Sequence, residues 1–178
     1  MSPLAWSAAV AEIPDGGLPL ARRATPEDCR ELAVALAVLE VTRVELKGRL
    51  LSRGGGRYRL TGKLFADVTQ ACVVTLDPVP AALDLALEID LVPMEQMPRV
   101  PDGDGDPDDT DTVEAPLIEP IRNGSIDLGD IVYQEIAAAL DPYPRSPDAA
   151  LDLTQAAPAA DDRIHPFAKL KALQPKPK

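Results

Sequence analysis

The sequence predicts an α+β protein in which an antiparallel, strongly curved or barrel-like sheet carries two main helices, at about residues 26–38 and 127–140. Polar and apolar residues alternate strictly on both sides of a triple glycine between residues 41 and 64, which indicates a long β-hairpin with one face in water. A second alternating stretch at residues 83–91 indicates another half-buried strand. Apolar residues at spacings of three and four define the helices.

The chain has 178 residues, 46% of them hydrophobic, and can therefore bury one core. We expect a single α+β domain at residues 5–145 with an acidic flexible insert at about 98–116. A flexible Pro- and Ala-rich tail with a basic end should follow at residues 146–178. The 19 prolines cluster near the termini and around residues 93–120, where they oppose regular packing.

The start of the chain has neither the basic region nor the long apolar run of a signal peptide. No uncharged apolar segment is long enough to span a bilayer. We therefore expect a cytoplasmic protein without membrane contact.

Turn and capping residues predict the N-terminal elements. Residues 6–13 and 17–23 are expected to form two strands joined by a Pro-Asp-Gly-Gly turn. Thr25 is a suitable N-cap and Pro26 a suitable first helical residue. The first helix should begin there and end near residue 38.

The predicted hairpin turns at residues 52–56, and its second strand should continue to residue 74. Between residues 43 and 63 it carries seven basic side chains and the single acid Glu45, a local charge of +6, whereas the whole chain carries −11. Clustered cations of this kind bind phosphates. Base stacking is not expected, because the only aromatic interleaved with them, Tyr58, belongs to the opposite face. The candidate RNA-contacting residues are Arg43, Lys47, Arg49, Arg57, Arg59 and Lys63.

The strand at residues 83–91 has an acidic outer face formed by Asp84, Glu88 and Asp90. If it pairs with a basic strand, opposite charges will face each other across the ladder. Such pairing would explain the basic face without any ligand. Both interpretations stay open at this point.

The insert at residues 98–116 is dominated by acids, and its DGDGDPDD stretch has the alternating Asp of an EF-hand loop. Pro107 occupies the position that requires glycine, and Val113 the position of the bidentate Glu. No metal site is therefore predicted. A solvated loop is expected instead. The candidate protein-binding residues of the insert and the tail are Asp102, Asp104, Asp106, Asp108, Asp109, Lys169 and Lys171.

Short strands around residues 117–118 and 124–126 flank an Asn-Gly turn. Asp127 then caps the second helix. Glu135 interrupts the apolar face of this helix. Since no second acid stands at a defined spacing, we expect an edge or capping role for it.

The side chains that carry most enzyme chemistry are scarce. The only histidine, His165, lies in the tail, and Cys29 and Cys72 fall on apolar sides of their elements, which predicts buried free thiols. No phosphate-binding glycine loop, nucleophile motif or metal-ligand set is present. We predict no enzymatic activity and no cofactor, and the acidic balance argues against DNA binding.

Four stretches, taken in order, are GKLFADVTQACVVTLDPVP at 62–80, the acidic alternating strand with its insert, IDLGDIVYQEIAAALDPYPRSP at 126–147, and the closing HPFAKLKAL. They resemble the YceD family, the large-ribosomal-RNA-subunit accumulation proteins of bacteria and plastids. The resemblance covers the chain from about residue 18 onward. It implies a non-enzymatic role in accumulation of large-subunit ribosomal RNA, and so in assembly of the large ribosomal subunit.

Many members of that family carry a Cys-x-x-Cys pair in the strand where this chain has Cys72 and Thr75. Further cysteines occur in some members near the end of the second helix, where this chain has none. A metal or redox role suggested for cysteine-rich members is therefore not implied here.

The sequence thus predicts an accessory factor that contacts ribosomal RNA or a large-subunit ribosomal protein through charged faces. One alternative is an acidic module that binds a basic protein. Another is a barrel that binds a small molecule, which would need an interior cavity.

Overall fold

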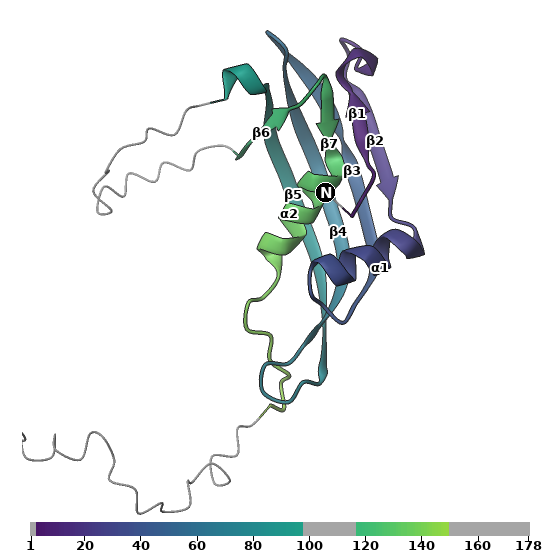
Figure 1. Cartoon of the computed structure of the whole chain (residues 1–178), viewed down its shortest axis with the longest axis vertical. Helices are drawn as coiled ribbons and strands as arrows, with labels where there is room; N and C mark the ends of the chain where they lie inside the picture. Colours follow the sequence, from purple (N-terminus) through teal and green to yellow (C-terminus); the bar gives the residue numbers. More distant parts are fainter. Residues whose placement is uncertain (1–2, 98–116, 150–178) are drawn as a thin grey trace, which may run out of the picture.

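The computed structural model describes residues 3–97 and 117–149. A five-stranded sheet with the order β2-β3-β4-β5-β6 forms one layer. The two helices and a small β1–β7 sheet lie on one side of it (Figure 1). The elements are β1 (Ser7–Ala9), η1 (Val10–Glu12), β2 (Leu18–Arg23), α1 (Pro26–Ala35), β3 (Glu40–Gly54), β4 (Arg57–Ala71), β5 (Pro78–Pro93), η2 (Met94–Gln96), β6 (Leu117–Ile121), β7 (Ser125–Asp127) and α2 (Leu128–Ala139).

The predicted α+β class with a mostly antiparallel sheet is confirmed. Strands β2 to β5 form an antiparallel meander, and β6 joins β5 in parallel. Strands β2 and β6 are the two edges of the described sheet, so the sheet is open. The closed form of the predicted barrel-like sheet is therefore not adopted.

The β3–β4 hairpin is the longest feature of the sheet and turns where the triple glycine predicts. Gly54, Gly55 and Gly56 all have positive φ angles, of 79°, 62° and 76°, which glycine adopts without steric cost. Halfway along the hairpin Gly48 pairs with Gly62. A Cβ atom on Gly62 would collide with the backbone of Lys47 and Gly48, so these two strands approach closely only because both residues are glycine.

The core fills the space between the inner face of the sheet and the helices. The inner side chains of β3, β4 and β5 are aliphatic, and α1 and α2 cover them with Leu32 and Ile136 among others. The fully buried aliphatic residues of the sheet include Leu46, Leu50, Leu60, Leu64 and Leu91. Apolar burial of this extent stabilises the fold by roughly 25 cal/mol per Å² removed from water.

The caps of both helices are those the sequence predicts. The hydroxyl of Thr25 accepts a hydrogen bond from the Asp28 N–H at 3.1 Å, and the Asp28 carboxylate accepts one from the Thr25 N–H at 2.8 Å. The Asp127 carboxylate likewise accepts from the Asp130 N–H. Each cap satisfies backbone donors that the first helical turn leaves unpaired.

The first helix is shorter than predicted, because it ends at Ala35 instead of residue 38. Ala37 has a φ of 54°, and the Val38 N–H bonds back to the Ala33 carbonyl at 3.0 Å. This left-handed closure ends the helix although the apolar spacing continues.

Three strand boundaries also differ from the prediction. The first strand is limited to Ser7–Ala9, because the chain winds into η1 where a strand to residue 13 was expected. Strand β4 ends at Ala71, not at residue 74, and β5 already begins at Pro78. Pro78 and Pro80 are tolerated in β5, because the first part of β5 pairs with β4 on one side and has no described strand on the other.

The predicted Asn-Gly turn is present, with φ angles of 51° at Asn123 and 69° at Gly124. Its two flanks serve different sheets, since β6 pairs with β5 and β7 pairs with β1. The turn therefore carries the chain from the large sheet to the small one. It also positions α2 over β5, which α2 contacts.

The predicted insert at residues 98–116 and residues 150–178 of the predicted tail lie outside the described residues, so the predicted domain limits stay predictions. None of the helices within residues 3–97 and 117–149 is long and apolar enough to cross a membrane.

Candidate nucleic-acid interface

The outer face of the sheet, defined here as the side turned away from the helices, carries the predicted basic residues. Alternation along β3 and β4 points leucines and valines inward and charged side chains outward. Among the described elements, both helices pack on the opposite side of the sheet (Figure 1). The six predicted RNA-contacting residues belong to β3 and β4, within one antiparallel hairpin.

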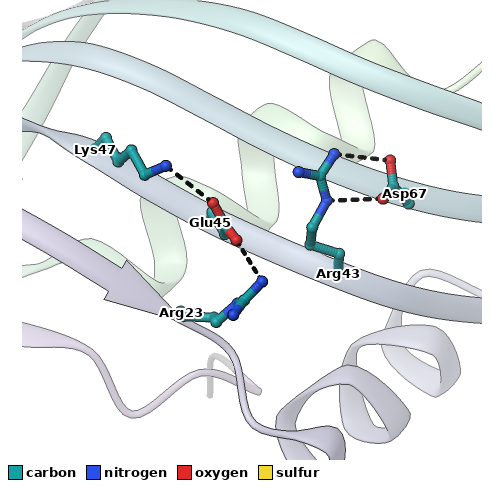
Figure 2. A network of polar contacts seen from close by, with 5 residues as sticks. All are labelled: Arg23, Arg43, Glu45, Lys47 and Asp67. Carbon is teal, nitrogen blue, oxygen red and sulfur yellow. Dashed lines mark hydrogen bonds and ion pairs between the residues drawn. The ribbon is translucent and has the colours of Figure 1, made fainter.

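Ion pairs neutralise the centre of the outer face, which we define as Arg43, Lys47, Arg59 and Lys63 with their acids. Figure 2 shows the Arg43 guanidinium donating to both oxygens of Asp67, at 2.7 and 3.2 Å. Glu45 lies between Arg23, at 2.7 Å, and Lys47, at 3.2 Å. The hydrogen bonds from Arg43 and Lys47 are the main reason that the pKa values of the Asp67 and Glu45 carboxyls lie below their ordinary values.

The acidic strand neutralises the other half of the centre. Arg59 donates to both oxygens of Asp90, at 2.6 and 2.8 Å, and to Glu88 at 2.7 Å. Lys63 donates to Asp84 at 3.1 Å. Strand β5 pairs with the basic strand β4, so the condition stated for the acidic strand is met and opposite charges face each other across the ladder.

Lys47 and Lys63 form the one directly opposed like-charge pair among the predicted residues. Each ammonium lies 5.8 Å from the centre of the Phe65 ring. The ring face attracts both cations and offsets part of their repulsion.

Two of the six predicted residues, Arg49 and Arg57, have no carboxylate within 4.0 Å in the described part of the chain. The same holds for Arg53, which was counted in the basic stretch but not predicted as a contact residue. We call Arg49, Arg53 and Arg57 the hairpin-end arginines. The strict alternation that indicates the other contact residues does not extend to Arg53, because Arg53 stands directly before the triple glycine.

Arg57 is held by an uncharged partner. Its Nε donates to the Gln96 side-chain oxygen at 3.2 Å, and the Gln96 amide nitrogen donates to the Gly55 carbonyl at 3.0 Å. This arrangement orients the guanidinium without cancelling its charge. Beside it lies a hollow of about 430 Å³ lined by Arg53, Arg57, Tyr58, Arg59, Asp90, Leu91, Val92 and Ile118.

An acidic groove of about 480 Å³ lies on the other side of the molecule, between the N-terminal segment, β6 and α2. Trp6, Glu119, Asp127 and Asp130 are among the residues that line it. Burial, and then the charge of Asp130, raise the pKa of Glu119. Burial raises the pKa of Glu135, which is half-buried on α2 in accordance with its expected edge position.

Both cysteines are buried free thiols, as predicted. Hydrogen bonds from the Thr75 side chain, and then from the backbone N–H groups of Ser146, Thr75 and Val74, lower the pKa of Cys72 to about 6. Burial raises the pKa of Cys29. In the described ranges no three side chains of His, Cys, Asp or Glu gather in a way that could hold a metal ion.

The predicted protein-binding residues all lie outside the described residues. These are Asp102, Asp104, Asp106, Asp108, Asp109, Lys169 and Lys171. Their predicted role stays a prediction.

No curated protein and no solved structure matches the chain significantly. One family model does, described as "Large ribosomal RNA subunit accumulation protein YceD", and it matches residues 60–174. The matched region includes β4 from Leu60 onward, whereas the hairpin-end arginines precede it. The match covers more than half of the sequence, so the predicted resemblance is confirmed. The chain belongs to the YceD family.

Proposed function

We propose that this protein is a non-enzymatic accessory factor for accumulation of large-subunit ribosomal RNA, and that it contacts the RNA with the outer face of its sheet. The family description connects the chain to large-subunit ribosomal RNA. One observation carries the finer proposal. The hairpin-end arginines lack carboxylate partners among the described residues, whereas the central cations of the same face are ion-paired.

The physical reason is the cost of exchanging partners. A cation already bonded to a carboxylate must give up that bond before it can bind a phosphate, so its net contribution to RNA affinity is small. An arginine facing only water or a neutral amide gains the full benefit of releasing the counterions condensed on RNA. RNA contact is therefore assigned to Arg49, Arg53 and Arg57 before Arg43, Lys47, Arg59 and Lys63.

Contact with the phosphate backbone of the RNA suits a factor that binds a large folded RNA. Phosphate contacts position a protein without reading sequence. The total charge of −11 would oppose broad binding to nucleic acid and restrict contact to the basic end of the face. A cytoplasmic location accords with this role.

Gradient sedimentation of cell extract at low and high salt tests the proposal. We expect the tagged protein to migrate with precursors of the large subunit at low salt and as free protein at high salt. We also expect a deletion strain to accumulate less large-subunit ribosomal RNA relative to small-subunit RNA. Free migration in all conditions, together with a normal subunit ratio in the deletion strain, would contradict the proposal.

A second candidate is an acidic module that binds a basic large-subunit ribosomal protein. The total charge and the acidic groove at Glu119, Asp127 and Asp130 favour it. Two variants separate the candidates. Deletion of residues 102–114 should weaken co-migration if a basic protein is the partner, and neutralisation of the hairpin-end arginines should weaken it if RNA is the partner.

A further inference from the structure

We infer that the hollow at the hairpin end binds a phosphate of single-stranded RNA, with Arg53 and Arg57 as its ligands and Tyr58 beside the attached nucleotide. This inference rests on the proposed function and names the contact point within it. The hollow lies between the start of β4 and the end of β5 and is also lined by Ile118 of β6.

The charge around the hollow is what a phosphate requires. Three guanidinium groups and one carboxylate line it. Arg59 holds both oxygens of that carboxylate, Asp90, so their charges cancel each other. The positive charges of Arg53 and Arg57 remain, and the nearby Arg53 also contributes to the lowered pKa of Asp90. Among the described residues these two guanidinium groups have no carboxylate within 4.0 Å, and two such groups at one concave site match a phosphodiester, which carries one negative charge and two acceptor oxygens.

One of the two ligands is already oriented. The Arg57 guanidinium donates to Gln96, and Gln96 is fixed in turn by the Gly55 carbonyl. A guanidinium has five N–H donors, so those on its terminal nitrogens are not used by Gln96. Because the Arg57 guanidinium is already oriented, less conformational entropy is lost when a phosphate binds.

The remaining wall suits the organic part of a nucleotide. Tyr58, Leu91, Val92 and Ile118 supply aromatic and aliphatic surface next to the arginines. A volume of about 430 Å³ is in the range of small-ligand sites. A base can reach such a wall only when it is unpaired, which points to a single strand. The sequence predicts that Tyr58 belongs to the inner side of the hairpin. In the structure Tyr58, at the start of β4, also lines the hollow.

The centre of the outer face does not combine these features. Arg43, Lys47 and Lys63 are each bonded to a carboxylate. They also do not line the hollows of about 480, 430, 360 and 290 Å³ in the described part of the chain. The hairpin end is therefore the place where phosphate affinity should concentrate.

Fluorescence anisotropy with the full-length protein and a labelled single-stranded RNA of about 12 nucleotides tests this inference, since such lengths are typical of single-strand sites. The test variant is Arg53→Ala/Arg57→Ala. The matched control is Arg22→Ala/Arg30→Ala, which also removes two arginines that have no ion pair within the described ranges but leaves the hollow intact. Circular dichroism and thermal melting of each variant verify that it is folded.

We expect the test variant to bind the RNA about 10-fold more weakly than the wild type, and the control to bind within about 2-fold. The slope of log affinity against log salt should fall by about 0.7 in the test variant, because the two arginines share one phosphate and each phosphate contact on a single strand contributes about 0.7. A third variant, Gln96→Ala, should lower affinity while leaving the slope unchanged, because it removes the orientation of Arg57 but not its charge.

Competition distinguishes the possible sources of the phosphate. Unlabelled single-stranded RNA should displace the probe at much lower concentration than AMP or inorganic phosphate does. Displacement by AMP at equal concentration would overturn the assignment to RNA and make the hollow a site for free nucleotides. Equal losses in the test and control variants would overturn the hollow as the contact point while RNA binding by the protein stands. No RNA binding by the wild type would overturn both the inference and the proposed RNA contact.

Discussion

Arg43 in the centre of the outer face and Arg57 at its hairpin end are both outward arginines of one antiparallel hairpin. Arg43 is bonded twice to Asp67 across the β3–β4 ladder. Arg57 is bonded to a neutral glutamine that follows β5. The two residues fit the same sequence pattern, yet within the described part of the chain only the first has a carboxylate partner.

The difference arises from register. Strand β5 places Asp84, Glu88 and Asp90 beside Lys63 and Arg59. Asp90 is the last acid of β5 and pairs with Arg59, so β5 has no acid opposite Arg57. The basic stretch is therefore ion-paired along only part of its length within the described residues. Its affinity for anions depends on which carboxylates the neighbouring strands bring alongside.

The largest expected effect is the contrast between two triple variants of equal charge. Arg49→Gln/Arg53→Gln/Arg57→Gln should lower affinity for single-stranded RNA by about 30-fold, because a third arginine of equal contribution adds to the roughly 10-fold loss expected for Arg53 and Arg57 together. Arg43→Gln/Lys47→Gln/Lys63→Gln should lower it by less than about 5-fold, because those cations are already paired. Anisotropy titrations at one fixed salt concentration measure both. Equal losses would erase the distinction between centre and hairpin end.

A second prediction concerns the close contact of β3 and β4, which supports both regions. Gly62→Ala should lower the free energy of unfolding by about 2 kcal/mol, because its Cβ would meet the backbone of β3. Gly16→Ala is the matched control, since a Cβ at Gly16 meets nothing within 4 Å. Urea unfolding followed by circular dichroism gives both values. An unchanged midpoint for Gly62→Ala would show that the strands can separate locally at no cost.

A third prediction converts a paired arginine into an available one. Asp90→Asn removes the carboxylate that occupies Arg59, and Arg59 lines the same hollow as Arg53 and Arg57. RNA affinity should rise about 3-fold to 10-fold, and the salt slope should become steeper by about 0.7. Asp84→Asn, which frees Lys63 in the centre away from the hollow, is the comparison variant and should produce a smaller gain. Reduced RNA affinity in Asp90→Asn would contradict the view that carboxylates silence the central cations.

The smallest expected effect is a pH signature in stability. The pKa of Asp67 is lowered by its hydrogen bond to Arg43, so the ionised carboxylate stabilises the fold above its unfolded pKa of about 3.9. This contribution is lost as the pH falls through the lowered folded pKa. The difference in unfolding free energy between the wild type and Asp67→Asn should therefore be present at pH 7 and disappear at strongly acidic pH.

Gln96→Ala provides the matched measurement at the hairpin end. Its bond to Arg57 involves no titrating acid, so its small effect on stability should stay constant over the same pH range. Urea unfolding at a series of pH values measures both variants. A pH-independent effect of Asp67→Asn would show that the ion pair with Arg43 contributes nothing to stability.

Much of the fold was predictable because local rules govern it. The capping residues Thr25 and Asp127 predicted both helix starts, and the triple glycine predicted the hairpin turn. Errors occurred where a backbone conformation without a residue signature ended an element, as at Ala37. Prolines 78 and 80 suggested the end of a strand, but with only one described neighbouring strand at that position they were compatible with its beginning.

The sequence by itself determined the fold class, the long charged hairpin and the family resemblance, because periodicity, turn residues and motif order are properties of neighbouring positions. Only the tertiary structure decided which cations are neutralised. Arg43 meets Asp67 across 24 residues, Arg59 meets Asp90 across 31, and Arg57 meets Gln96 across 39. Electrostatic partners depend on the register between strands and on distances of a few ångströms, which no local pattern specifies.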